Sequence, residues 1–234
     1  GLGASASLCV SVIGVLNHLR KKNRLTKHDI AETAFRSEQD RLKNMTGRQD
    51  QYAASFGGIN LFEFFGDKNV RVNPIEISKD YLLEIEKNIL LVYSGMKGKS
   101  SGDMHNKEKE KNLYENIEKI KILNDIKENG LEVAFSLRRG NLKKFGKLIK
   151  ENWEKKKKFN PETTNIYIEA LIEEALNNGA VGARLMGAGG GGHILIYCEP
   201  DKEHKVREIL ASRGAKAVDF SFDFEGLKVW EVEE

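Results

Sequence analysis

The first residues of this 234-residue chain are small and rich in glycine: Gly1-Leu2-Gly3-Ala4-Ser5-Ala6. Glycines let backbone N–H groups approach an anion closely, and a helix beginning near Ala4 would add partial positive charge at its N-terminus. Ser5 would offer a hydroxyl to a phosphate or to Mg²⁺. The pattern predicts a phosphate-binding turn. The alternative is an ordinary tight turn in which Ser5 caps the helix.

Two carboxylates are candidates to work beside such a turn. Asp50 follows the polar run Thr46 to Gln49, which predicts a loop, and Glu38 falls on a helix predicted from about Thr26 to Asn44. Asp50 would orient or deprotonate an attacking hydroxyl, and Glu38 would hold Mg²⁺, which prefers oxygen ligands. The alternatives are a turn or capping role for Asp50 and, for Glu38, a solvated ion pair with a nearby arginine.

A second glycine-rich segment lies near the C-terminal end, between two apolar runs that read as strands. It comprises Gly187, Ala188, Gly189, Gly190, Gly191 and Gly192. Glycine loses more backbone entropy on folding than any other residue, so such a loop needs a reason. Close approach of its backbone to another group is the reason we expect. A sharp connection between strands is the alternative.

Two familiar nucleotide-binding patterns fit poorly. The opening turn matches the dinucleotide pattern, but residues 17–24 are polar and basic where that fold needs a second strand. The segment Gly98-Lys99-Ser100 has Gly95 before it, which leaves two residues between the glycines where a phosphate-loop ATPase needs four.

Composition narrows the class of protein. Lys+Arg 38 against Asp+Glu 35 gives a formal charge of +3, too small to argue for nucleic acid or an anionic membrane as partner. The longest early apolar run, residues 8–16, is far shorter than the ~20 residues of a membrane span. Cys9 and Cys198 lie in apolar surroundings, which favours free thiols and a cytoplasmic location.

Hydrophobic periodicity predicts a mixture of helices and strands, and hence an α+β fold. We expect helices over 4–20 (buried on nearly all sides), 26–44, 81–87, 113–129, 132–139, 142–158, one beginning at Asn160-Pro161, and 202–213. We expect strands over 59–65, 70–77, 89–93, 182–186, 194–198, 215–224 and 227–232, and a mobile loop over 96–112.

Together these motifs resemble the GHMP family of small-molecule kinases. The opening turn is similar to that family's second motif, and Leu185 to Gly192 is similar to its third. The segment 47–60 (GRQDQYAASFGGIN) resembles the branch of D-glycero-D-manno-heptose 7-phosphate kinases and fucokinase-like sugar kinases. So do Trp153 with Lys155–Lys158, Gly179-Ala180, and the run 218–220.

The resemblance implies roles at matching positions. Gly1, Gly3, Ala4, Ser5 and Ala6 would bind the ATP phosphates, Ser5 and Glu38 would coordinate Mg²⁺, and Asp50 would act on the substrate hydroxyl. Gly187, Ala188, Gly189, Gly190 and Gly191 would shape a substrate loop between the domains. Two domains are implied: residues 1–76, like ribosomal protein S5, and residues 77–234, ferredoxin-like.

The implied reaction is transfer of the γ-phosphoryl group of ATP to the anomeric hydroxyl of heptose 7-phosphate, with a small-molecule partner and a monomer or homodimer. The alternatives are kinases of unphosphorylated galactose or fucose, and a catalytically incomplete nucleotide-binding fragment. The family's first motif is absent, which predicts a missing N-terminal part. Ala4 stands where many members have Ser, and Arg184 where close relatives carry Lys.

Overall fold

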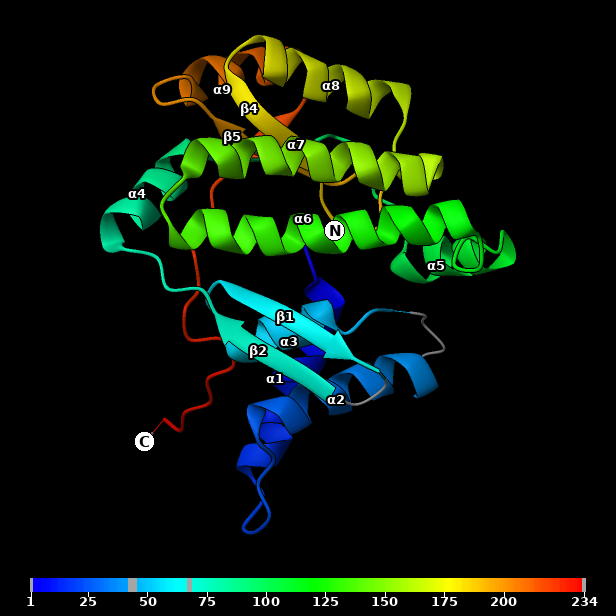
Figure 1. Cartoon of the computed structure of the whole chain (residues 1–234). Helices are drawn as coiled ribbons and strands as arrows, with labels where there is room; N and C mark the ends of the chain where they lie inside the picture. Colours follow the sequence, from blue (N-terminus) through cyan, green and yellow to red (C-terminus); the bar gives the residue numbers. More distant parts are fainter. Residues whose placement is uncertain (1, 42–45, 67–68, 233–234) are drawn as a thin grey trace. The chain divides into compact units, whose positions relative to one another are not determined.

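The computed structural model describes residues 2–41, 46–66 and 69–232. It divides into two compact units (Figure 1). One contains residues 3–74 together with the C-terminal segment from Phe222, and the other contains Leu2 and residues 75–221. The expected division into domains 1–76 and 77–234 remains a prediction.

The first unit is a group of three helices with a β-hairpin. Its elements are α1 (Ala4–His18), α2 (Lys27–Arg36), the π-helix η1 (Ser37–Arg41), α3 (Gln49–Phe56), β1 (Asn60–Phe65) and β2 (Asn69–Pro74). α2 begins at a capping box, in which Thr26 and Asp29 satisfy each other's backbone amides. Val10, Ile30 and Ala34 form the small core between α1 and α2.

α1 corrects one prediction, because it is not buried on all sides. Its buried residues, Ala6, Val10 and Gly14, recur every four positions and form one stripe. Cys9 and Ile13 are partly buried against the same core, and four other apolar side chains are exposed in this structure: Leu8, Val12, Val15 and Leu16. Periodicity failed here because an all-apolar helix carries no signal for which face is covered.

The second unit is built on a four-stranded antiparallel sheet. Its elements are α4 (Lys79–Asn88), β3 (Ile89–Tyr93), α5 (Ser101–Glu110), α6 (Ile117–Arg138), α7 (Leu142–Phe159), the 3₁₀ turn η2 (Pro161–Thr163), α8 (Ile166–Asn177), β4 (Ala180–Leu185), β5 (His193–Cys198), α9 (Glu203–Ser212) and β6 (Lys216–Val218). The strand order is β4-β5-β3-β6. With helices between β3 and β4 and between β5 and β6, this is the predicted ferredoxin-like arrangement.

Helix α7 packs directly against β4. A Cβ added to Gly182 would lie 1.9 Å from the carbonyl oxygen of Gly146, so both backbones need glycine to come this close. On β4, Gly182 and Arg184 therefore face α7, while Ala183 and Leu185 join the main apolar core with α8 and α9. α6 and α7 lie side by side (Figure 1).

Six other sequence expectations need correction. The polar stretch 96–112 contains a helix, α5, because Ser100 accepts from the Asp103 amide and Met104 is buried. The helices predicted over 113–129 and 132–139 are one, α6, since Gly130 costs only about 1 kcal/mol in a helix interior. Pro161 opens a 3₁₀ turn, and α8 begins only after its cap, Asn165.

The other three corrections concern two strands near the C-terminus and one helix. Only Lys216–Val218 of the predicted strand 215–224 pairs in the sheet, and residues 227–232 form no strand. The helix predicted over residues 26–44 is divided into α2 and the π-helix η1. Its expected end, at residues 42–44, lies outside the described residues. The other predicted elements are confirmed to within three residues at their ends.

The α+β class is confirmed by the two units. In the part of the chain that the structure describes, no helix is both long and apolar enough to span a lipid bilayer. The described cysteines are unpaired, as expected.

Candidate active site

The N-terminus of α1 is open. Gly3 caps the helix with left-handed backbone angles (φ 71°), and no side chain of the described residues bonds to the first-turn amides. The first intrahelical bond runs from the Ser7 amide to the Gly3 carbonyl, at 2.9 Å. Ala4 and Ser5 are exposed. The first turn therefore presents unsatisfied N–H groups and the positive end of the helix dipole, which favour an anion. Gly1 lies outside the described residues.

A polar group of three side chains lies beside this turn. The Ser5 hydroxyl donates to Glu38 Oε1 at 2.5 Å, and the Gln51 amide donates to Glu38 Oε2. Glu38 is only 2% exposed, so the solvated ion pair considered as its alternative does not form. It lies on the π-helix η1, a distortion that often accompanies functional sites.

Asp50 approaches the same turn from α3. It lies in the first turn of that helix rather than in a loop, because α3 already begins at Gln49. A Cβ built on Gly3 would lie 3.4 Å from Asp50 Cβ and Cγ, so the carboxyl group packs against the cap of α1. Burial raises the pKa of Asp50; a hydrogen bond from Gln49 offsets part of this, and the Glu38 carboxylate adds to it.

A second polar network fixes the start of α3. Arg48 Nε and the Tyr52 hydroxyl each donate to Glu32 Oε1 at 3.0 Å, and the Arg48 guanidinium stacks 4.2 Å from the centre of the Phe35 ring. These contacts join α3 to α2 on both sides of Asp50 in the sequence. Asp50 is therefore held by rigid neighbours, which a base or orienting group requires.

The donor set fits Mg²⁺. The Glu38 carboxylate and the Ser5 hydroxyl are hard oxygen donors in contact, and among the described residues no lysine or arginine pairs with Glu38. The Gln51 Oε1 atom is buried and accepts no hydrogen bond from the described residues, so this side chain has one unsatisfied acceptor. The described residues contain no cluster of three metal-binding side chains, so phosphate and water would complete the shell.

The second glycine segment behaves differently. A Cβ on Gly189 would lie 2.5 Å from the Thr163 carbonyl oxygen, and one on Gly191 would lie 2.7 Å from that of Lys97. The Gly190 amide donates to the Thr163 carbonyl, and the Gly189 carbonyl accepts from the Lys99 amide. Close approach of backbone is thus the reason for these glycines, as predicted, but the partner is the unit's own backbone. Ala188 lies between Gly187 and Gly189 in the same turn.

Sequence families match both parts of the chain. Residues 1–58 match the GHMP kinases N terminal domain, and residues 134–216 match GHMP kinases C terminal. The chain belongs to the GHMP kinase family. The resemblance stated from the motifs is confirmed.

Individual relatives of this GHMP chain are sugar kinases. D-glycero-alpha-D-manno-heptose 7-phosphate kinase of Campylobacter jejuni is 29% identical over 232 residues, covering 99% of this chain and 67% of the relative. Galactokinase of Pyrococcus furiosus is 26% identical over 249 residues, covering 94% and 68%. A crystal structure of D-glycero-D-manno-heptose 1-phosphate kinase from Bacteriodes thetaiotaomicron has a TM-score of 0.73 at 24% identity, covering 99% of this chain and 64% of that one.

The GHMP chain thus spans about two thirds of the length of these relatives. Within its first unit the structure brings together Gly3, Ser5, Glu38 and Asp50, with Ala4 and Ala6 in the same helical turn. Gly187 to Gly191 lie in the other unit, and their expected role in a substrate loop remains a prediction.

Sequence reasoning assigned no role to Gln51, Glu32 or Arg48. Gln51 lies inside the quoted 47–60 segment, and the polar, charged character of its neighbours gives no sign that it is fully buried. Glu32 precedes Glu38 by six residues in the same predicted helix, and its residue type alone does not distinguish a partly buried acid from a solvated one.

Proposed function

We propose that this chain carries out ATP- and Mg²⁺-dependent phosphoryl transfer to a hydroxyl of a sugar. One observation carries the proposal: a serine, a buried glutamate and a half-buried aspartate converge on the open N-terminus of α1. Phosphoryl transfer needs positioning and charge stabilisation rather than covalent catalysis, and this arrangement supplies both.

Each residue has a distinct task in this proposal. The amides of the first turn of α1, from Gly3 to Ala6, bind phosphate oxygens of ATP. Asp50, held by Arg48 and Tyr52 on its own helix, orients the sugar hydroxyl and accepts its proton. Burial raises the pKa of Asp50, which makes it a stronger base than an ordinary aspartate.

Ser5 and Glu38 would hold Mg²⁺, which when bound neutralises charge on the transferring phosphoryl group. Gln51 orients Glu38 by donating to its second carboxylate oxygen. This leaves Glu38 Oε1 directed to Ser5 and the metal position.

For the substrate we propose heptose 7-phosphate, phosphorylated at the anomeric hydroxyl. The similarity to the Campylobacter jejuni heptose kinase over 99% of this chain supports this choice. The similarity to galactokinases supports the alternative, an unphosphorylated sugar such as galactose or fucose. Both substrates use the same chemistry at Asp50.

The experiment compares Asp50→Asn with a control, Asp40→Asn, which changes an exposed residue of η1. ADP release is measured with heptose 7-phosphate, galactose and fucose, and binding of a non-hydrolysable ATP analogue is measured by calorimetry. We expect Asp50→Asn to lower turnover by about 10²–10⁴-fold with little change in ATP affinity, because it removes only the base. Asp40→Asn should match the wild type.

Three outcomes would contradict parts of the proposal. Unchanged turnover in Asp50→Asn removes that residue from the mechanism. Preference for galactose or fucose overturns the heptose assignment alone. ATP binding without turnover on any of these sugars would favour the third alternative, a nucleotide-binding protein that lacks catalysis.

A further inference from the structure

Two cations meet at the start of the second glycine segment, inside one unit. Lys156 on α7 donates to the Gly187 carbonyl at 2.7 Å. Arg184, the residue of β4 that faces α7, donates through Nη1 to Asn152 Oδ1 at 2.6 Å. Lys156 and Asn152 are four residues apart on α7, so Lys156, Asn152 and Arg184 share one face of the helix–sheet contact.

This pair lacks an anionic partner. Among the described residues, neither Lys156 nor Arg184 forms an ion pair with a carboxylate. Arg184 Nε is buried and has no hydrogen-bond acceptor. The nearest acid acting on Lys156 is Glu108, whose carboxylate already accepts from Asn160 and Tyr114.

The pKa values of Lys156 and Arg184 are both lowered. Burial lowers the pKa of Lys156 to about 8, with repulsion from Arg184 adding to the effect and Glu108 opposing it. Burial also lowers the pKa of Arg184. Two like charges in a partly buried site destabilise each other unless an anion lies between them.

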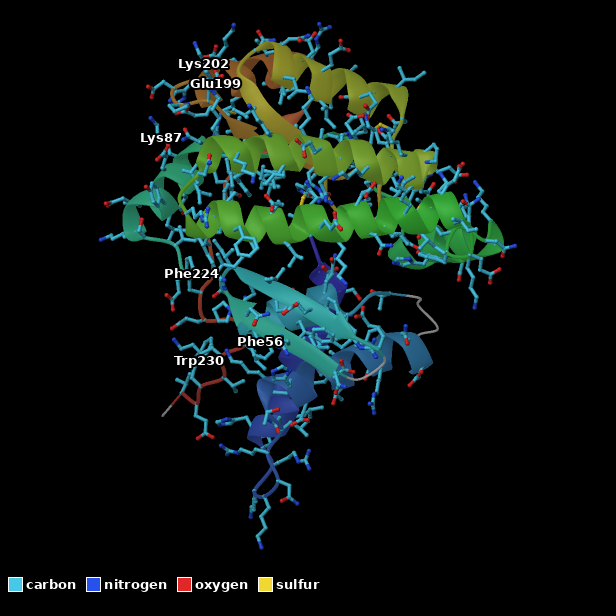
Figure 2. The ribbon with its side chains drawn as sticks, in the orientation of Figure 1. Phe56, Lys87, Glu199, Lys202, Phe224 and Trp230 are labelled. Atoms are coloured by element: carbon cyan, nitrogen blue, oxygen red, sulfur yellow. The ribbon has the colours of Figure 1, made fainter. Side chains whose placement is uncertain are left out.

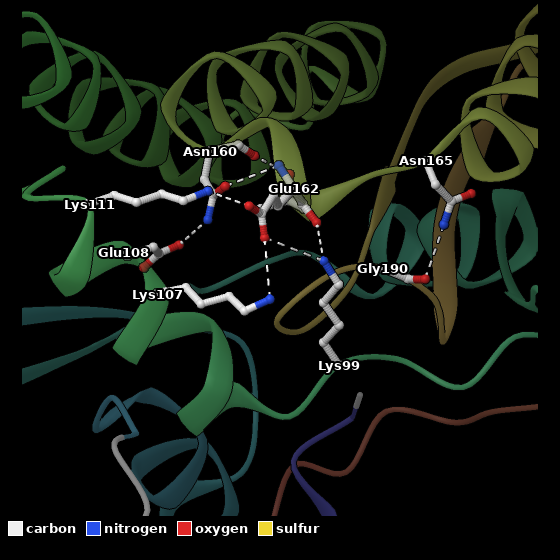
Figure 3. A network of polar contacts seen from close by, with 9 residues as sticks. Lys99, Lys107, Glu108, Lys111, Asn160, Glu162, Asn165 and Gly190 are labelled. Carbon is white, nitrogen blue, oxygen red and sulfur yellow. Dashed lines mark hydrogen bonds and ion pairs between the residues drawn. The ribbon is translucent and has the colours of Figure 1, made fainter.

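Three other lysines of this unit are paired with a carboxylate of the protein itself. Lys99, Lys107 and Lys111 all surround the carboxylate of Glu162 (Figure 3). Lys99 also donates to the Glu162 carbonyl at 3.0 Å, which joins the cluster to the glycine segment through the Lys99 amide. The exposed lysines thus have an acid within the protein, whereas the half-buried pair of Lys156 and Arg184 has none among the described residues.

We propose that Lys156 and Arg184 form a subsite for a phosphate group, which takes the place of the missing acid. Arginine offers a planar set of N–H donors and lysine a compact charge, and together they suit a tetrahedral dianion better than a single carboxylate. Asn152 Nδ2 is not available to the anion, because it donates to Asn129. The phosphate would belong to a sugar phosphate or to ATP; the inference deepens the proposed function and rests on it only for the choice of ligand.

The first test uses inorganic phosphate and the chain itself. Phosphate should raise the thermal unfolding midpoint of the wild type, and its dissociation constant should increase by about 10-fold or more in Lys156→Met and in Arg184→Gln, since each loses a charged hydrogen bond. Lys147→Met, an exposed lysine on the same helix, is the control and should bind as the wild type does.

The second test distinguishes the sources of the phosphate. Calorimetry with mannose 6-phosphate, mannose and ADP, on the wild type and Lys156→Met, separates them. Weakening confined to mannose 6-phosphate assigns the subsite to the sugar phosphate, and weakening confined to ADP assigns it to the nucleotide. Equal binding of all ligands by both proteins would overturn the subsite and leave a purely structural role in holding Gly187.

A third readout reports on the charge of Lys156 itself. A bound phosphate should restore its ordinary protonation, so binding at pH 8 should take up about half a proton, measured in buffers of different ionisation enthalpy. Lys156→Met should abolish this uptake. Phosphate binding alone tests the subsite. If the protein phosphorylates a sugar but binds no free phosphate, the subsite is refuted and the proposed reaction is not.

Discussion

Both glycine-rich segments bring backbone close to another group, but their surroundings differ. At the start of α1, Gly3 leaves the amides of the first turn without a side-chain partner. In the segment 187–192, the glycines are pressed against Thr163, Met96 and Lys97 of their own unit, and several of their backbone groups are already bonded. Glycine enrichment therefore signals close backbone contact, and only the partners show whether a ligand is involved.

The largest expected effect comes from adding one methyl group to each glycine-rich segment. Gly189→Ala should destabilise the protein by about 3–5 kcal/mol, because its Cβ would overlap the Thr163 backbone at a left-handed position (φ 113°). Gly3→Ala should cost only about 1–2 kcal/mol, since its nearest contact is 3.4 Å, yet should weaken ATP binding.

Urea denaturation of both variants gives the stabilities, and calorimetry gives the nucleotide affinities. Gly192→Ala serves as a control for strain alone, since no atom lies within 4 Å of its added Cβ. Equal destabilisation by Gly189→Ala and Gly192→Ala would mean that the Thr163 contact does not matter.

Removing the proposed Mg²⁺ ligands should have a smaller effect, which concerns only the segment at the start of α1. Ser5→Ala combined with Glu38→Gln should raise the Mg²⁺ concentration needed for half-maximal turnover by at least about 10-fold, because both protein ligands are weakened. A Mg²⁺ titration of the ADP-release rate measures this. Ser11→Ala combined with Asp40→Asn is the matched control, and an unshifted titration in the first variant would remove the metal site.

The smallest expected effect is on pH dependence. Activity should fall as the pH drops through the pKa of Asp50, which burial raises and Glu38 raises further. Glu38→Gln removes the negative neighbour but not the burial, so the acid limb of the turnover profile should move to lower pH only in part. The profile is measured at saturating Mg²⁺; movement to higher pH would contradict this electrostatic account.

Local signals made the sheet and most helices predictable from sequence. β3, with five consecutive apolar residues before Ser94, was predicted at its observed bounds because a buried central strand needs no alternation. α5 was missed because its support is non-local: Met104 is buried and Glu108 is held by Asn160, fifty-two residues away. Polarity alone made that segment resemble a loop.

The candidate site was only partly predictable for the same reason. Residue type and spacing indicated Ser5, Glu38 and Asp50, and the structure places them together. Nothing local could show that Gln51 is completely buried or that Arg184 lacks an acid, because both facts depend on which elements pack together. Their assigned roles stay predictions for the experiments above.

The C-terminal segment of the first unit has a consequence for synthesis. Figure 2 marks Phe56, at the end of α3, and Phe224, in this segment. The Leu227 amide donates to the Ser55 carbonyl at 3.1 Å, and a Cβ on Gly14 would meet the Leu227 side chain at 2.7 Å. The helix that carries Asp50 gains these neighbours only after more than 160 further residues have left the ribosome. Synthesis must therefore reach this segment before the unit that contains α3 can close.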